Sequence, residues 1–213
     1  MKLNSVILAD DSADCNMRNL CVILTDNTNQ LLQLYQTTQK VDVNNVVLSS
    51  DAVSKDNISE QLSQINNNNF ISFWYGHGKS NVFSIAGEDI ITTTENHYIF
   101  TNALIYTFSC LNGNELADVL ITNGAKVFIG YKESAQCPLG IDDVTSQIAQ
   151  TFIVSFVIKG KQVKEAVSDL KTAYNDVIYG NYVDPIRRSL FQTNRDSLVL
   201  KGNGNLTIND FVI

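Results

Sequence analysis

The stretch FISFWYGHG, residues 70–78, decides how the rest of the chain can be interpreted. Its first six residues are uncharged and mostly apolar, which is typical of a strand buried on both faces of a parallel sheet. His77 follows between two glycines, where this strand must end. Glycine lets another part of the chain or a substrate approach closely. Because the sequence holds only two histidines, we take His77 as a candidate functional residue.

Apolar runs of the same kind recur on both sides of this stretch and alternate with helical patterns. That alternation predicts an α/β fold with a mostly parallel central sheet covered by helices. A β-hairpin is expected within residues 82–100, and a second hairpin with a glycine turn within 197–208. Further strands are expected at SVILAD (5–10), NNVVLSS (44–50), ALIYTFS (103–109) and KVFIGY (126–131), and helices around 17–24, 58–65, 113–124, 142–159 and 163–177.

Length and composition limit the classes of protein to consider. The 213 residues, 44% of them hydrophobic, suit one globular domain spanning 1–213. A net charge of −7 argues against a nucleic-acid partner, which needs a basic face. The longest apolar stretch, IAQTFIVSFVIKG (148–160), is too short and too polar for a membrane anchor, and the first apolar run is too short for a signal peptide, so a cytoplasmic protein is expected.

The four cysteines are Cys15, Cys21, Cys110 and Cys137. They form no CxxC pair, and the two histidines lack metal-ligand spacing, so we expect neither a metal site nor a cofactor. Cys15, Cys21 and Cys137 are expected to be structural.

Cys110 directly follows the strand expected at residues 103–109, much as His77 follows the strand at 70–75. In open α/β sheets, ligands bind beyond the carboxyl ends of the strands. If the two strands are neighbours, the two side chains emerge at one edge, where histidine can take the proton of a cysteine nucleophile. The backbone N–H groups of Gly78 and Cys110 could then donate to the oxyanion of an acyl-transfer intermediate.

This block, FISFWYGHG followed by a hairpin and then ALIYTFSCLNGNELADVLITNGAKVFIGY (103–131), resembles the caspase-like cysteine peptidases, and within them the CHAT and gingipain type. FIVSFVIKGKQVKEAVSDLKTAYND (152–176) is similar to their paired helices, whereas Asn203 and Gly204 replace the Asp-Pro of gingipain relatives. The resemblance implies a three-layer α-β-α sandwich with a β-hairpin insertion and a bacterial source. It also implies a protein or peptide as substrate and, as for some relatives, a partner protein that the peptidase cleaves. It implies His77 as general base or acid and Cys110 as nucleophile.

In such peptidases two segments form the pocket for the residue before the cleaved bond. They are the end of the first strand and the segment that follows the fifth strand. Here those segments carry Asp10, Asp11 and Glu133, whose carboxylates would suit Arg or Lys. Phe108 stands where many basic-specific relatives carry an Asp. The acids could instead cap a helix or be solvated, and Lys132 could face the pocket and favour an acidic residue, with Phe108 and Tyr131 as lining.

Two alternatives remain open. VILADDSAD (6–14) is similar to the start of a receiver domain, in which an acidic pair holds magnesium, and Asp51 and Lys132 would then be the phosphoacceptor and the lysine after the last strand. A receiver is shorter and has no hairpin between its later strands. The second alternative is a catalytically silent scaffold with the caspase-like fold.

Overall fold

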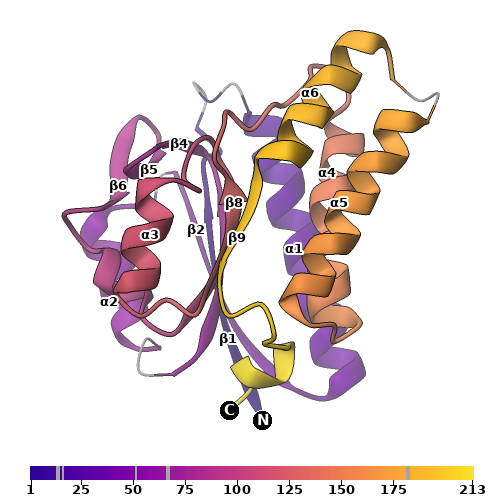
Figure 1. The fold of residues 1–213 in the computed structure, drawn as a ribbon. Helices are drawn as coiled ribbons and strands as arrows, with labels where there is room; N and C mark the ends of the chain where they lie inside the picture. The colour runs from indigo at the N-terminus through magenta and orange to yellow at the C-terminus, as the bar shows by residue number, and fades with distance from the viewer. Residues whose placement is uncertain (13–14, 16, 51, 66–67, 181–182) are drawn as a thin grey trace.

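A computed structural model describes residues 1–12, 15, 17–50, 52–65, 68–180 and 183–213. Its centre is a six-stranded sheet in the order β2-β1-β3-β7-β8-β9 (Figure 1). The first five strands run parallel, and β9 pairs antiparallel with β8. The predicted α/β fold is confirmed. The strands are β1 (Lys2–Ala9), β2 (Asp42–Ser49), β3 (Phe70–Tyr75), β7 (Ala103–Phe108), β8 (Val127–Tyr131) and β9 (Leu198–Gly202).

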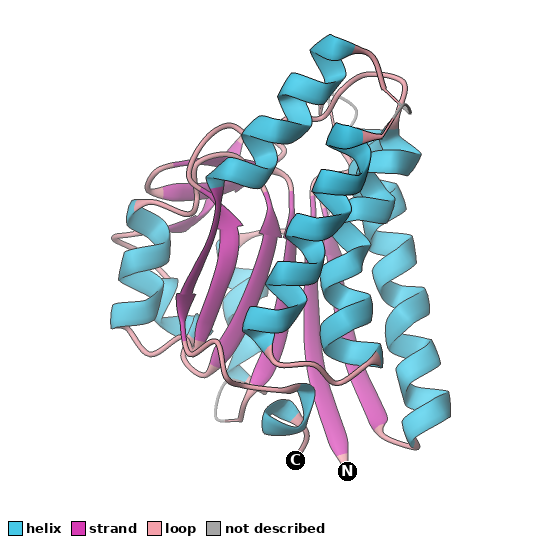
Figure 2. Cartoon of the chain, turned by 45° about the vertical axis from the view of Figure 1, so that its right-hand side comes forward, coloured by secondary structure: helices cyan, strands magenta, loops and turns pink. Residues whose placement is uncertain are grey.

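Helices cover both faces of this sheet, which makes the three layers that were expected (Figures 1 and 2). One face carries α1 (Arg18–Gln39), α4 (Asp142–Ile153), which continues as a π-helical turn (Val154–Ile158), and α5 (Val163–Tyr179), with α6 (Pro185–Ser197) beside them. The other carries α2 (Lys55–Ser63) and α3 (Glu115–Thr122). None of the helices in the described ranges is long and apolar enough to cross a membrane.

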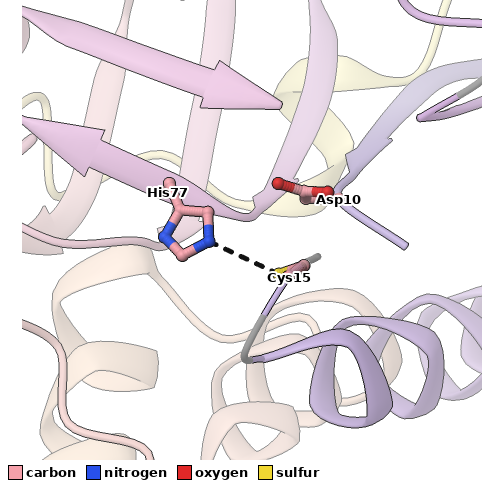
Figure 3. Close-up of side chains that lie close together, drawn as sticks. All are labelled: Asp10, Cys15 and His77. Carbon is pink, nitrogen blue, oxygen red and sulfur yellow. Dashed lines mark hydrogen bonds between the residues drawn. The ribbon is translucent and has the colours of Figure 1, made fainter. Parts of the chain in front are cut away.

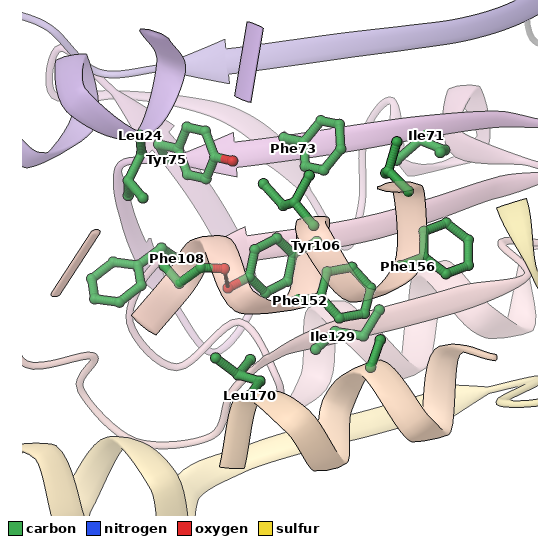
Figure 4. Packing of buried hydrophobic residues seen from close by; sticks show 14 of the residues in the cluster. Leu24, Ile71, Phe73, Tyr75, Tyr106, Phe108, Ile129, Phe152, Phe156 and Leu170 are labelled. Carbon is green, nitrogen blue, oxygen red and sulfur yellow. Dashed lines mark hydrogen bonds between the residues drawn. The ribbon is translucent and has the colours of Figure 1, made fainter. Parts of the chain in front are cut away.

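Strand β3 is buried on both sides, which explains its unbroken apolar sequence. Phe73 and Tyr75 pack into the cluster under α1, α4 and α5 (Figure 4). Trp74 points to the opposite cluster, where the centroid of its ring lies 5.2 Å from the ring centroid of Phe83 and 4.9 Å from that of Phe100. The sheet is therefore the shared wall of two hydrophobic cores.

The segment between β3 and β7 forms a small second sheet on the α2–α3 side of the molecule (Figure 1). The hairpin expected within residues 82–100 is confirmed as β5 (Val82–Ile85) and β6 (Glu88–Thr92), followed by a 3₁₀ turn, His97–Phe100. A third strand, β4 (His77–Lys79), pairs with β5. His77 thus begins the small sheet directly after the end of β3.

The C-terminal part of the chain differs from the sequence-based expectation. The hairpin expected at 197–208 is wrong: this stretch holds one strand, β9, which pairs with the otherwise open edge of β8 and is followed by a 3₁₀ turn, Ile208–Phe211. Pairing with the edge of β8 gives the backbone N–H and C=O groups of β9 the hydrogen bonds that a local hairpin would have supplied. Helix α6 was not predicted either, although Asp184 caps its N-terminus and Pro185 occupies its first turn, which is a recognised helix-start signal.

Candidate active site

The carboxyl ends of β1, β3 and β7 lie side by side at one edge of the central sheet. The backbone N–H of Asp10 donates to the carbonyl of Tyr75 at 2.8 Å, and that of Gly76 donates to the carbonyl of Phe108 at 3.4 Å. The first residues beyond these three strands are therefore brought together, as the sequence predicted for His77 and Cys110 from their strand-end positions.

The turn that carries Cys110 is held in an unusual backbone conformation. Leu111 has a φ of 62°, in the left-handed region that a branched side chain rarely adopts. Its N–H donates to the carbonyl of Glu133 at 3.0 Å, and the N–H of Gly113 donates to that of Tyr131 at 2.9 Å. The end of β8 thus fixes the turn, and backbone strain of this kind is concentrated at functional sites.

Asn112 joins this turn to the hairpin that begins at His77. Its side chain is buried, and Nδ2 donates to the carbonyls of Lys79 at 2.8 Å and Val82 at 2.6 Å. Its Oδ1 accepts from the hydroxyl of Ser109. Asn112 was not among the residues predicted for the site, although it is a small polar residue two positions after the candidate nucleophile.

Gly78 lies directly against the Cys110 turn. A Cβ atom at this position would lie 2.4 Å from the carbonyl oxygen of Cys110 and 2.5 Å from Oδ1 of Asn112. Both distances are well inside van der Waals contact, so only glycine fits. The residue after His77 and the backbone of Cys110 are therefore immediate neighbours.

In this structure the imidazole of His77 is engaged by a different cysteine (Figure 3). Nε2 of His77 lies 3.5 Å from Sγ of Cys15, a residue in the segment between β1 and α1. The hydrogen bond with Cys15 and the negative charges of Cys15 and Asp10 raise the pKa of His77, although burial opposes this. The Cys21 thiol and His77 together hold the pKa of Cys15 below its ordinary value, against the effect of burial. Cys15 was expected to be structural, and its contact with His77 was not predicted, because 62 residues separate the two in the sequence.

The Cys110 thiol is half-buried and lies 3.8 Å from the carbonyl oxygen of Ala135. Burial raises its pKa, and hydrogen bonds with the backbone of Ala135 and the side chain of Ser134 offset this only in part. Among the described residues, no hydrogen bond joins Cys110 to His77. The turns of the expected dyad are adjacent, but the imidazole is directed to Cys15.

Asp10 shares a cavity with His77. The cavity holds about 310 Å³ and is lined by Asp10, Ser12, Cys15, His77, Ala86 and Gly87. Asp10 as a whole is only 1% exposed. Its Oδ1 accepts from the N–H and hydroxyl of Ser12 and from the hydroxyl of Ser50, and Oδ2 accepts from the N–H of Ala86 at 3.0 Å.

The other two acids expected in the pocket are in different surroundings. Asp11 and Ser50 exchange two hydrogen bonds of 2.9 Å, which link the ends of β1 and β2. Glu133 is exposed and, with Lys132, lines a separate cavity of about 490 Å³ against α6. Phe108 and Tyr131 are fully buried against each other, so neither offers an exposed lining surface.

The receiver alternative finds little support in this geometry. Asp51 lies outside the described residues, and the chain between the neighbouring strands β3 and β7 forms a three-stranded sheet that a receiver does not have. Asp10 and Lys132 also line separate cavities. A receiver needs its acidic pair and its lysine around one phosphorylation site.

Comparison with known proteins adds information about the fold. No protein-family model matches the sequence, and no curated protein matches it. A solved structure described as a protease superposes with a TM-score of 0.64 at 12% identity, covering 96% of this chain and 48% of the other. A protein from Geobacter sulfurreducens gives a TM-score of 0.51 at 8% identity, covering 99% and 97%. This chain therefore spans about half the length of the protease, and identities this low show a shared fold alone.

A third solved structure is a secreted C11 cysteine protease from Bacteroides thetaiotaomicron in complex with an irreversible peptide inhibitor. It aligns with a TM-score of 0.46 at 13% identity, over 86% of this chain and 62% of the other.

Proposed function

We propose that this protein is a cysteine endopeptidase of the caspase-like class, related to the CHAT and gingipain type, with Cys110 as nucleophile and His77 as its proton partner. The observation that carries the proposal is the contact between the two strand-end turns, in which Gly78 lies against the backbone of Cys110. A thiol and an imidazole on adjacent, rigidly held turns are what nucleophilic acyl transfer requires.

The chemistry follows from these groups. The sulfur of Cys110 attacks the carbonyl carbon of a peptide bond while its proton passes to His77. The backbone N–H groups of Gly78 and Cys110 donate to the oxyanion that forms. As the C–N bond breaks, His77 returns the proton to the leaving amine, and water then hydrolyses the thioester to release the acid and regenerate the thiol.

For this reaction His77 must exchange its contact with Cys15 for one with Cys110. Catalytic hydrogen bonds are often long or misaligned before substrate binds, so the resting contact is compatible with the proposed pair. Cys110 is favoured over Cys15 because it is the more exposed thiol and lies on a turn fixed by Asn112 and Leu111. Cys15 is only 7% exposed.

An electrophilic peptide probe tests the assignment. We expect such a probe to label Cys110 in preference to the other three cysteines, and a His77→Ala substitution to suppress that labelling, as peptide mapping by mass spectrometry would show. Labelling of Cys15 in its place would move the nucleophile to that residue. Failure to label any cysteine or to cleave any peptide would leave the silent scaffold as the better description.

We also propose a preference for Arg or Lys before the cleaved bond. Glu133 supports it best, because it is exposed beside a cavity and follows the strand next to the Cys110 turn. The oxygens of Asp10 already accept several hydrogen bonds, and Asp11 is bound to Ser50, so these acids have less capacity for a guanidinium.

Glu133→Gln is expected to lower kcat/KM for substrates with Arg at this position by about tenfold or more, because a charge-assisted hydrogen bond contributes about 1.5–3 kcal/mol. Cleavage of substrates with a neutral residue should change little. The measurement is a positional scan of peptide substrates, with Glu60→Gln on α2 as a matched control. A preference for Asp or for apolar residues in the scan would rule the basic pocket out while leaving the dyad untouched, and would direct attention to Lys132.

A further inference from the structure

We propose that Asp10, Cys15 and His77 form a binding site for a divalent transition-metal ion of the zinc class. The three residues come from the end of β1, the segment after it, and the start of β4, and one ligand atom of each lies within 4.8 Å of the others (Figure 3). The metal would hold His77 away from Cys110 and so inhibit the peptidase; this second part depends on the proposed function.

The spacing between the sulfur and the imidazole nitrogen already suits a metal. With Zn–S near 2.3 Å and Zn–N near 2.05 Å, a tetrahedral site separates these two atoms by about 3.6 Å. Sγ of Cys15 and Nε2 of His77 are 3.5 Å apart. A carboxylate oxygen of Asp10 must approach by no more than about 1.5 Å to reach the roughly 3.4 Å that a tetrahedral O–N or O–S edge requires.

The surroundings of Asp10 hold its carboxylate in a fixed orientation. Ser12 and Ser50 donate to Oδ1, and Ala86 donates to Oδ2. Such bonds from outside the ligand shell orient a ligating group and strengthen metal sites. A carboxylate offers about four acceptor positions, so Oδ2, with the one bond described from Ala86, retains one for a metal. The adjoining cavity leaves room for a water as fourth ligand.

The ligand types determine which metals should bind. Thiolate and imidazole favour zinc and its neighbours in the first transition row, whereas magnesium and calcium require oxygen ligands. On binding, Cys15 coordinates as the thiolate, Nε2 of His77 gives its lone pair to the metal, and the proton shared by the pair passes to the buffer. A metal-bound Nε2 can no longer accept a proton from Cys110.

Cobalt(II) is the probe for the experiment, because a thiolate bound to Co²⁺ gives a near-ultraviolet charge-transfer band. Titration of the 213-residue chain should saturate this band at one cobalt per chain. Zn²⁺ should displace the cobalt, and excess Mg²⁺ should not. Cys15→Ser should abolish the band, and Asp10→Asn and His77→Ala should each weaken cobalt binding by at least about tenfold. Circular dichroism of each variant checks that it is folded.

Two other cysteines provide matched controls. Cys137 lies 3.7 Å from Oδ1 of Asp142, so it is a thiol beside a carboxylate, but it is not part of the cluster with His77. Cys137→Ser and Cys110→Ala should both retain the band. Three results would contradict the proposed metal site. The band could persist in Cys15→Ser, it could disappear in Cys110→Ala, or it could fail to saturate.

The proposed inhibition of peptide cleavage by the bound metal is tested separately. Peptide cleavage should fall in step with Zn²⁺ occupancy of this site, and activity that persists at full occupancy would contradict inhibition. If the protein cleaves no peptide at all, the proposed function fails, and the metal site is still decided by the cobalt spectrum alone.

Discussion

Replacing Cys110 by alanine is expected to reduce peptide cleavage by roughly 10⁴-fold or more, because removal of a nucleophile eliminates the covalent route and leaves only the contribution of binding and the oxyanion donors. The fold should be retained, since Cys110 is only half-buried and its thiol makes few polar contacts, a long one with the carbonyl of Ala135 and one with Ser134. The measurement is kcat/KM on the best substrate from the positional scan, together with a denaturant unfolding curve.

Two further cysteine variants make this result specific. Cys137→Ala should cleave at the unaltered rate, because Cys137 lies beside Asp142 and is not grouped with His77. Cys15→Ala decides between the two thiols near the imidazole: if Cys15→Ala is inactive and Cys110→Ala is active, then Cys15 is the nucleophile and the proposed dyad is wrong.

Gly78→Ala is expected to damage both stability and activity. Its Cβ would lie 2.4 Å from the carbonyl oxygen of Cys110, which is backbone, and 2.5 Å from Oδ1 of Asn112, which is held by several hydrogen bonds. Neither neighbour can move without displacing the Cys110 turn. We expect the free energy of unfolding to fall by about 1–3 kcal/mol or somewhat more, and cleavage to fall even in the protein that remains folded.

Gly87→Ala is the control for the loss of glycine alone. Gly87 also belongs to this region and has a φ of +78°, but a Cβ there would meet no atom within 4 Å. Backbone strain alone should cost about 1–2 kcal/mol in stability. Unfolding curves separate the two cases: a Gly78→Ala protein as stable and active as the unaltered one would mean that the two turns are not in contact.

The positions of the central strands could be predicted because each is an apolar run between polar or glycine-containing segments. The run at residues 70–75 coincides with β3, and the run at 103–109 contains β7. The C-terminal segment could not be predicted in the same way. Whether residues 197–208 pair with each other or with β8 depends on an open sheet edge more than 60 residues away, which local turn signals do not report.

The residues of the candidate site also fall into two groups, those that could be predicted from the sequence and those that could not. His77 and Cys110 could be identified because each follows a recognisable strand, and strand ends converge in parallel sheets. Cys15 follows no strand directly, and its distance from His77 depends on the path of the segment before α1. Asn112 acts through hydrogen bonds to the backbone carbonyls of Lys79 and Val82. Every residue has such a carbonyl, so the sequence gives no sign of these bonds.

The helices α1, α4 and α5, which cover one face of the central sheet, affect how this protein folds during its synthesis. Phe73 and Tyr106 lie under α4 and α5, whose last residue, Tyr179, follows the end of β7 by about 70 positions. A ribosome adding roughly 5–20 residues per second needs on the order of ten seconds for that interval. In the nascent chain α1 alone can shield this aromatic face until α4 is complete at Ile153, and the part under α5 stays uncovered until Tyr179. During that interval the exposed aromatic face makes the growing chain prone to aggregation.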